Sequence, residues 1–133
     1  MLTRGITSIL ICFLTLLCFG QEDQINGNQY YLTGIMVNND YGSPYCGDIA
    51  FAKVYEFEIL TFSDTTYTQD TIGVIITCPE IYPIRFEVGK TYKISLSDEN
   101  QAKFDWLVIE EELLKKYNLP YYLWATEISE VKN

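Results

Sequence analysis

Alternation of apolar and polar residues is the clearest pattern in this chain, and it is strongest at residues 86–96, FEVGKTYKISL. Successive side chains of a strand point to opposite faces, so the alternation predicts a half-buried β-strand. The pair Gly89-Lys90 interrupts the pattern and predicts a kink or a tight turn. The side chains assigned to the buried face are Phe86, Val88, Tyr92, Ile94 and Leu96.

Four further strands are predicted from apolar, β-branched runs that turn-forming residues separate. The longest, residues 49–61, is apolar on both faces in its first half and alternates from Val54 onward. Such a strand is covered on both sides at one end and solvated on one side at the other, which suits a barrel or a strongly curled sheet. The remaining runs are residues 30–37, 71–78 and 121–131.

One helix is predicted before the last strand. Asp105 is a suitable cap for a helix that begins near Trp106, and Asn118 is a suitable end. Between them, glutamates precede lysines, which is the order that the helix dipole favours. The apolar stripe of this helix is Trp106, Ile109, Leu113 and Tyr117, with Leu114 beside it.

These elements predict a mainly β fold, a five-stranded antiparallel barrel of the OB type in one domain at residues 30–133. An OB-fold commonly carries its helix between the third and fourth strands. Here that gap, residues 79–85, contains two prolines and no helical pattern, so the helix is expected before the final strand instead.

The N-terminus has the pattern of a secretory signal peptide. Arg4 precedes an apolar run of about 14 residues, which is shorter than the roughly 20 that span a bilayer. We therefore expect a signal at residues 1–20, a flexible polar leader at residues 21–29, and export as a secreted or periplasmic protein. No other segment is apolar and long enough to predict a membrane span.

A lipoprotein signal, with Cys18 acylated, is the alternative for this segment. It fits less well, because Leu17 occupies the position where such signals place a small residue. The protein would then be tethered to a membrane by a lipid anchor at Cys18.

Two cysteines, Cys46 and Cys78, remain after a signal peptide is removed. In an oxidising compartment such a pair predicts a disulfide, which would stabilise the fold by about 3–4 kcal/mol in the chain-entropy model. A redox or metal site and a pair of buried free thiols are the alternatives. Neither a CxxC motif nor any histidine accompanies these cysteines.

The formal net charge of −9 changes the list of expected partners. Phosphate backbones and anionic lipid surfaces repel such a chain, so we expect no nucleic-acid partner. The acidic residues are most simply explained as keeping an exported domain soluble. A protein, a peptide or a glycan is the expected partner.

The absence of histidine removes most nucleophilic triads, most zinc sites and the usual general base near neutral pH. Glu56 and Glu58 share a strand face and could form a glycosidase-like pair, but a solvated face explains them more simply. Turn chemistry likewise explains the oxygen-rich runs at residues 38–40 and 98–100 without calcium. We expect no catalytic residue, no metal and no cofactor, and a carboxylate-based hydrolase ranks last.

Tyrosine is unusually frequent, with 11 copies. In the adjacent pairs Tyr30-Tyr31 and Tyr121-Tyr122, strand geometry sends one side chain outward unless both faces are covered. Exposed tyrosines can stack on sugar rings or grip a peptide, although they also commonly span core and rim. The candidate ligand-binding residues are Tyr31, Tyr41, Tyr45, Tyr121 and Tyr122.

The ordered segments AKVYEFEIL (52–60), IGVIITCPE (72–80) and FEVGKTYKISL (86–96) resemble the core of netrin-like domains, also found in tissue inhibitors of metalloproteinases. The similarity covers roughly residues 46–96 and rests on strand composition, one cysteine and the order F-x-x-G-K-x-Y. It implies a secreted OB barrel.

The chain departs from those inhibitors at its N-terminus. In them a mature N-terminal cysteine chelates the protease zinc through its amine and carbonyl groups. Here the expected first residue is Gln21, and acylation would block the amine of Cys18. We therefore expect a non-catalytic binding or interaction module, with a netrin-like protease inhibitor as the alternative. Inhibition would require an accessible N-terminus or a rigid loop such as residues 38–47.

Overall fold

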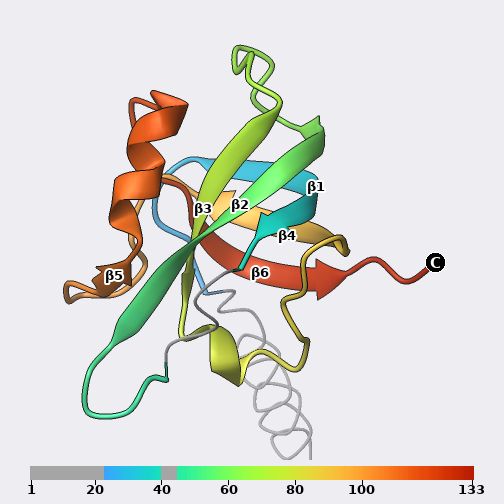
Figure 1. Ribbon diagram of the computed structural model, residues 1–133. Coiled ribbons are helices and arrows are strands. Elements are labelled where there is room, and N and C mark those ends of the chain that lie inside the picture. Colours follow the sequence, from blue (N-terminus) through green and yellow to red (C-terminus); the bar gives the residue numbers. More distant parts are fainter. Residues whose placement is uncertain (1–22, 40–44) are drawn as a thin grey trace, which may run out of the picture.

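The computed structural model describes residues 23–39 and 45–133, which form one sheet of six strands (Figure 1). The strands are β1 (Gln29–Asn38), β2 (Phe51–Phe62), β3 (Thr71–Thr77), β4 (Thr91–Ser97), β5 (Leu107–Ile109) and β6 (Trp124–Glu130). Two short 3₁₀ helices, η2 (Pro79–Ile81) and η3 (Glu111–Tyr117), lie between strands. The predicted signal peptide and the candidate residue Tyr41 lie outside the described residues.

The sheet runs in the order β1-β4-β6-β3-β2-β5, and β1 also pairs with β2. Four pairings are antiparallel, whereas β2–β5 and β3–β6 are parallel. The prediction of a mainly β fold is confirmed. The prediction of five strands, all antiparallel, is wrong, because a sixth short strand joins the sheet and makes it mixed.

The additional strand, β5, forms where the sequence pattern predicted the first turn of a helix. β1 pairs with β2 only from Glu56 onward, so the beginning of β2 has an edge that β1 does not reach. β5 pairs with β2 along this edge, and its first N–H donates to the Ala50 carbonyl at 2.9 Å. Glu110 then turns the chain in the left-handed region, with φ of 61°, and the helix begins only at Glu111. Tertiary pairing has overridden the helical periodicity.

Most of the side chains at residues 86–96 that were predicted to be buried lie in the main hydrophobic core. Tyr92, Ile94 and Leu96 are buried in it, on β4. Gly89 lies in a turn with φ of 88°, and the Lys90 N–H donates to the Glu87 carbonyl there. Val88 is 59% exposed, so its expected place on the buried face is wrong. The turn separates it from the strand, which begins at Thr91.

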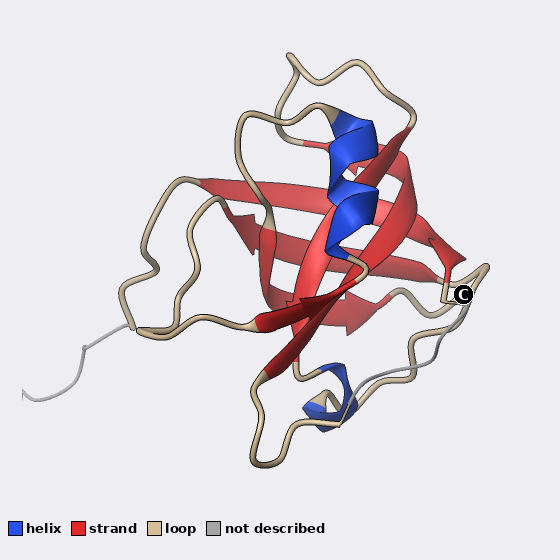
Figure 2. Cartoon of the chain, turned by 60° about the vertical axis from the view of Figure 1, so that its left-hand side comes forward, coloured by secondary structure: helices blue, strands red, loops and turns tan. Residues whose placement is uncertain are grey.

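A second, smaller core lies where η3 crosses the outer side of β2 and β3 (Figure 2). Gly73 on β3 allows this close approach, because a Cβ atom there would stand 3.0 Å from the Tyr117 ring. The buried members of this core are Ala52, Val54, Ile75 and Leu114. We call residues 107–117, which comprise β5 and η3, the cover.

The end of the predicted leader is hydrogen-bonded to the loop that follows β4. The Asn28 side chain donates to Asp98 at 2.9 Å, and the Asn26 N–H donates to Gln101 at 2.8 Å. Among the helices of the described residues, none has the length and hydropathy needed to cross a membrane.

Candidate functional site

A hollow of about 310 Å³ lies between the connection that joins β2 to β3 and the segment that joins η3 to β6. Residues from these two segments, which are distant in sequence, form its wall. We call it the hairpin hollow. It is lined by Asp64, residues 66–69 and residues 117–121.

Asp64 is the charged residue of this hollow, and hydrogen bonds hold both of its carboxylate oxygens. Oδ1 accepts from the N–H and the hydroxyl of Thr66, at 3.0 and 2.6 Å, which closes a local turn. Oδ2 accepts from the Tyr121 hydroxyl at 2.7 Å. The bonds from Thr66 and then Tyr121 hold the pKa of Asp64 below its usual value, so this carboxylate is ionised at neutral pH.

Tyr67 and Tyr121, which line the hollow, pack against further aromatic rings. Tyr121 stacks on Tyr30, with ring centroids 5.3 Å apart and planes 18° apart. Phe62 lies between Tyr30 and Tyr67, and it meets the Tyr67 ring edge to face at 5.7 Å. The Tyr67 hydroxyl donates to the Thr71 carbonyl at 2.6 Å. Burial raises the pKa of Tyr67 to about 12, so its hydroxyl keeps its proton.

Tyr117 connects the hollow to a buried carboxylate on β2. Its carbonyl accepts from the Gln69 side chain at 3.1 Å, and its hydroxyl donates to Glu56. Glu56 also accepts from Asn38 at 2.9 Å and from Lys116 at 3.3 Å. Burial acts to raise the pKa of Glu56, but the three hydrogen bonds together outweigh it and lower the pKa.

These contacts correct the expectation for the two strand glutamates. Glu56 is buried and hydrogen-bonded, whereas Glu58 on the same strand face is exposed. The solvated face predicted for both holds only for Glu58, because the cover lies over Glu56. The two carboxylates therefore lie in different environments and form no pair across a cleft.

Of the four candidate tyrosines that the structure describes, one lines the hairpin hollow. Tyr121 lines the hairpin hollow, whereas Tyr31 is 58% exposed on β1 and Tyr45 is 79% exposed beside the disulfide. Asp64 follows the end of β2, and the disulfide lies at its beginning. A 12-residue strand is roughly 36 Å long, so Tyr45 and Tyr121 belong to opposite ends of the sheet. Tyr122 is exposed and does not line the hollow.

Sequence reasoning missed most of the polar residues that line the hollow. Asp64, Tyr67 and Gln69 belong to a run that was predicted only as a polar connection between two strands. The aspartate two residues before a threonine is a local turn signal. A tyrosine within so polar a run is a second signal that could have indicated an anchored loop.

The predicted disulfide between Cys46 and Cys78 is confirmed, with the two Cα atoms 5.5 Å apart. It joins the segment before β2 to the segment after β3. The Cys78 N–H donates to the Phe51 carbonyl at 3.0 Å, which ties the same bridge to the first residue of β2. An intramolecular disulfide fits an extracellular protein.

Comparisons with protein-family models, with curated proteins and with solved structures found no match for this chain. The titratable groups of the hairpin hollow keep their protonation states near neutral pH. The Asp64 carboxylate has a lowered pKa, and burial and hydrogen bonding raise the pKa of Tyr67 and Tyr121. Groups in these states exchange no proton near neutral pH, but they donate and accept hydrogen bonds.

Proposed function

We propose that this protein is an exported, non-catalytic binding module built on a five-stranded OB-type barrel. The strand pairings support the barrel, because β1–β2–β3–β6–β4 returns by hydrogen bonding to β1. In this interpretation β5 is an addition to the edge of β2. The disulfide supports export.

The position of the cover suggests where a ligand does not bind. OB-folds commonly bind oligonucleotides and oligosaccharides on the face of their second and third strands and on adjacent loops. Here the corresponding outer face carries Val54 and Ile75, and Leu114 of the cover is packed against them. A ligand would have to displace this apolar contact. The hairpin hollow, at the end of the same two strands, is open without any rearrangement.

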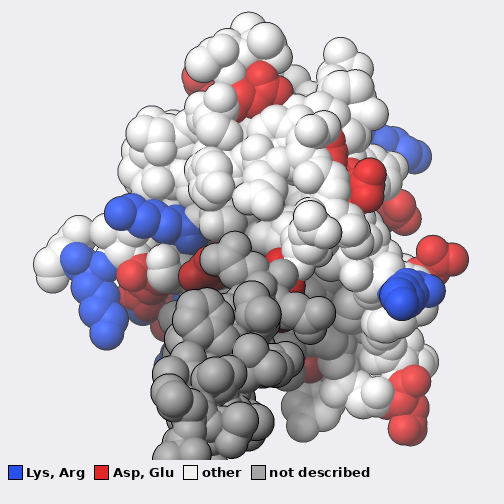
Figure 3. Space-filling view, turned by 180° about the vertical axis from the view of Figure 1, so that it is seen from behind, with Lys and Arg blue, Asp and Glu red and all other residues white. Residues whose placement is uncertain are grey.

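We propose that the hollow binds a neutral glycan. The observation that carries this proposal is the ionised Asp64 carboxylate, held beside a stacked pair of tyrosine rings. Carboxylate and amide groups pair with sugar hydroxyls, and aromatic rings pack against the apolar face of a sugar. The net charge of −9 opposes polyanions, and the face seen in Figure 3 carries scattered basic side chains rather than a continuous basic patch.

An array of neutral oligosaccharides, followed by titration calorimetry with the best binder, tests this proposal. Asp64→Asn should weaken binding roughly tenfold or more, because a charged acceptor is lost. Tyr31→Ala is the matched control, since this tyrosine is exposed outside the hollow. Unchanged binding in Asp64→Asn would overturn the site, and loss in Tyr31→Ala would favour the broader aromatic surface predicted from sequence.

A protease inhibitor is the second candidate, and one observation favours it. Tyr45 has the most exposed large hydrophobic side chain among the residues that the structure describes, and it precedes a cysteine whose N–H donates to Glu80 at 2.5 Å. The disulfide and this bond fix one end of the loop at residues 38–47, of which residues 40–44 lie outside the described residues. Slowing of metallo- or cysteine proteases, abolished by Tyr45→Ala, would support it. A panel of such proteases with unchanged rates would remove it.

A further inference from the structure

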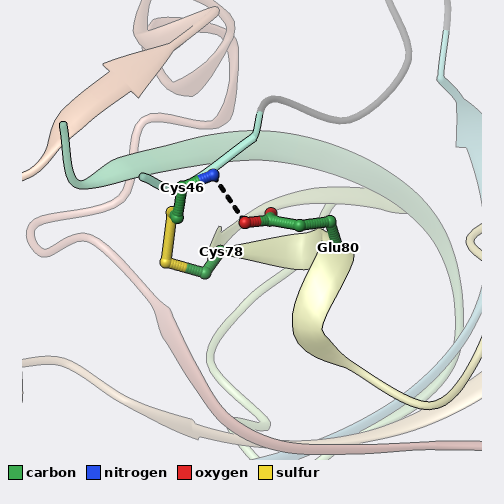
Figure 4. A group of neighbouring side chains, drawn as sticks. All are labelled: Cys46, Cys78 and Glu80. Carbon is green, nitrogen blue, oxygen red and sulfur yellow. Dashed lines mark hydrogen bonds between the residues drawn. A yellow bond between two sulfur atoms is a disulfide. The ribbon is translucent and has the colours of Figure 1, made fainter. Parts of the chain in front are cut away.

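A carboxylate stands against the disulfide at the opposite end of β2 from the hairpin hollow. Figure 4 shows Glu80, on η2, pointing toward Cys46 and Cys78. One carboxylate oxygen and the two sulfur atoms all lie within 4.8 Å of one another. Oε1 of Glu80 accepts from the Cys46 N–H at 2.5 Å, which orients the carboxylate toward the sulfurs.

The second oxygen of this carboxylate is anomalous. Glu80 Oε2 is buried and has no hydrogen-bond partner among the residues at 23–39 and 45–133. A buried carboxylate oxygen without a partner is destabilising and uncommon in native proteins. A cation that binds this oxygen would compensate for the lost hydration.

The two cysteines are held in place by contacts other than the bond between them. The Phe51 N–H donates to Cys46 Sγ at 3.4 Å, a contact that also stabilises a thiolate. Cys78 is held by its own N–H, which donates to the Phe51 carbonyl, and it adopts the left-handed conformation just before Pro79. Both sulfurs should therefore stay near Glu80 when the disulfide is reduced.

We propose that reduction converts Cys46, Cys78 and Glu80 into a site for a thiophilic divalent cation, Zn²⁺ in the first instance. A two-electron reductant, an external dithiol, breaks the sulfur–sulfur bond, supplies two protons and becomes a disulfide itself. The cation then displaces the two thiol protons to solvent and binds both thiolates and one carboxylate oxygen. An external disulfide reverses the reaction: it accepts two electrons from the thiolates and two protons from solvent, becomes a dithiol, and the reformed Cys46–Cys78 bond expels the cation.

The donor set selects the cation. Two thiolates favour zinc and other soft or borderline metals over calcium and magnesium, and a carboxylate is also a common zinc ligand. Three protein ligands leave the fourth tetrahedral position to water. Two thiolates and a carboxylate also repel one another, so the reduced site gains from a divalent cation more than the disulfide form does.

The test uses the full exported chain, whose disulfide is reduced with a phosphine. The phosphine takes an oxygen atom from water and becomes the phosphine oxide, while the two sulfur atoms become thiols. Zn²⁺ affinity is measured by competition with a chromophoric chelator, and Cd²⁺ reports thiolate ligation by its ultraviolet charge-transfer band. We expect one cation per reduced chain and none for the oxidised chain. Glu80→Gln should weaken Zn²⁺ binding at least tenfold, whereas Glu58→Gln, an exposed glutamate on β2, should leave it unchanged.

Two results would overturn the proposal. One is equal Zn²⁺ affinity in reduced wild type and reduced Glu80→Gln. The same result would follow if reduction unfolded the chain and the free thiols alone bound the metal. Another is binding by the reduced wild type that is no tighter than binding by the Cys46→Ser/Cys78→Ser variant. Circular dichroism of each reduced sample separates the two causes of equal affinity.

Discussion

The two halves of β2 differ in burial, and the buried half contains two charged residues whose burial its composition does not explain. Residues 52–57 are all buried, whereas the residues that follow are exposed or half-buried. The buried half contains Lys53 and Glu56, while Leu60 in the other half is 51% exposed. Segment 107–117, the cover, lies over the first half only. Burial of Lys53 and Glu56 therefore depends on a segment about 55 residues later in the chain rather than on the hydrophobicity of each residue.

The cover also supplies the partners that make burial of charge possible. Lys53 Nζ lies 3.5 Å from Glu110 and donates to Asn39 at 3.1 Å. Glu56 is bound by Lys116 and Tyr117 of η3. Each buried charge on β2 thus meets an opposite charge of the cover. These contacts hold the cover in register with the strand.

Lys53→Ala should produce the largest change. It leaves the Glu110 carboxylate, which is mostly buried, without its cation, and breaking a buried pair in this way costs about 3–5 kcal/mol. Glu58→Ala, in the exposed half of the strand, should change stability by less than about 0.5 kcal/mol. Urea unfolding measures both. Similar values for the two variants would remove the distinction between the halves.

Replacing both cysteines by alanine should lower the free energy of unfolding by about 3–4 kcal/mol, because the disulfide no longer restricts the unfolded chain. The bridge is tied to Phe51, at the start of the buried half. Hydrogen exchange should therefore show that amide protection decreases more at residues 51–57 than at residues 58–62. Equal loss along the strand would mean that the bridge acts on the unfolded chain alone.

Glu56 should give the protein an acid-sensitive contribution to stability. Its pKa in the folded protein is below its usual value of 4.5, so the contribution is complete above that value and is lost as the pH falls through the folded pKa. Urea unfolding of wild type between pH 7 and pH 3 should show this loss, and Glu56→Gln should show a flatter profile. Parallel profiles would contradict the assignment.

The alternation within β2 was sufficient to predict that one end is covered on both sides and the other is not. The cysteine pair was sufficient to predict the disulfide, because only one pairing is available if the predicted signal peptide is set aside. The cover itself was predicted as one helix, since Ile109 fits both a helical stripe and a strand edge. Tyr117, which binds Glu56, and the residues that complete the wall of the hairpin hollow are distant in sequence from the residues they meet. No local sequence pattern predicts such contacts.

Leu60→Thr should have the smallest effect, and its comparison with Val54→Thr is the sharpest test of the difference between the halves. Both changes replace an apolar side chain by a β-branched polar one that suits a strand. Val54 is buried under the cover, so its new hydroxyl loses water and should cost about 1–3 kcal/mol. Leu60 is half exposed, and its hydroxyl stays hydrated, so stability should change by less than about 0.5 kcal/mol. A clear loss in Leu60→Thr would mean that this leucine is covered by a partner in solution, and the exposed half of β2 would then be a binding surface.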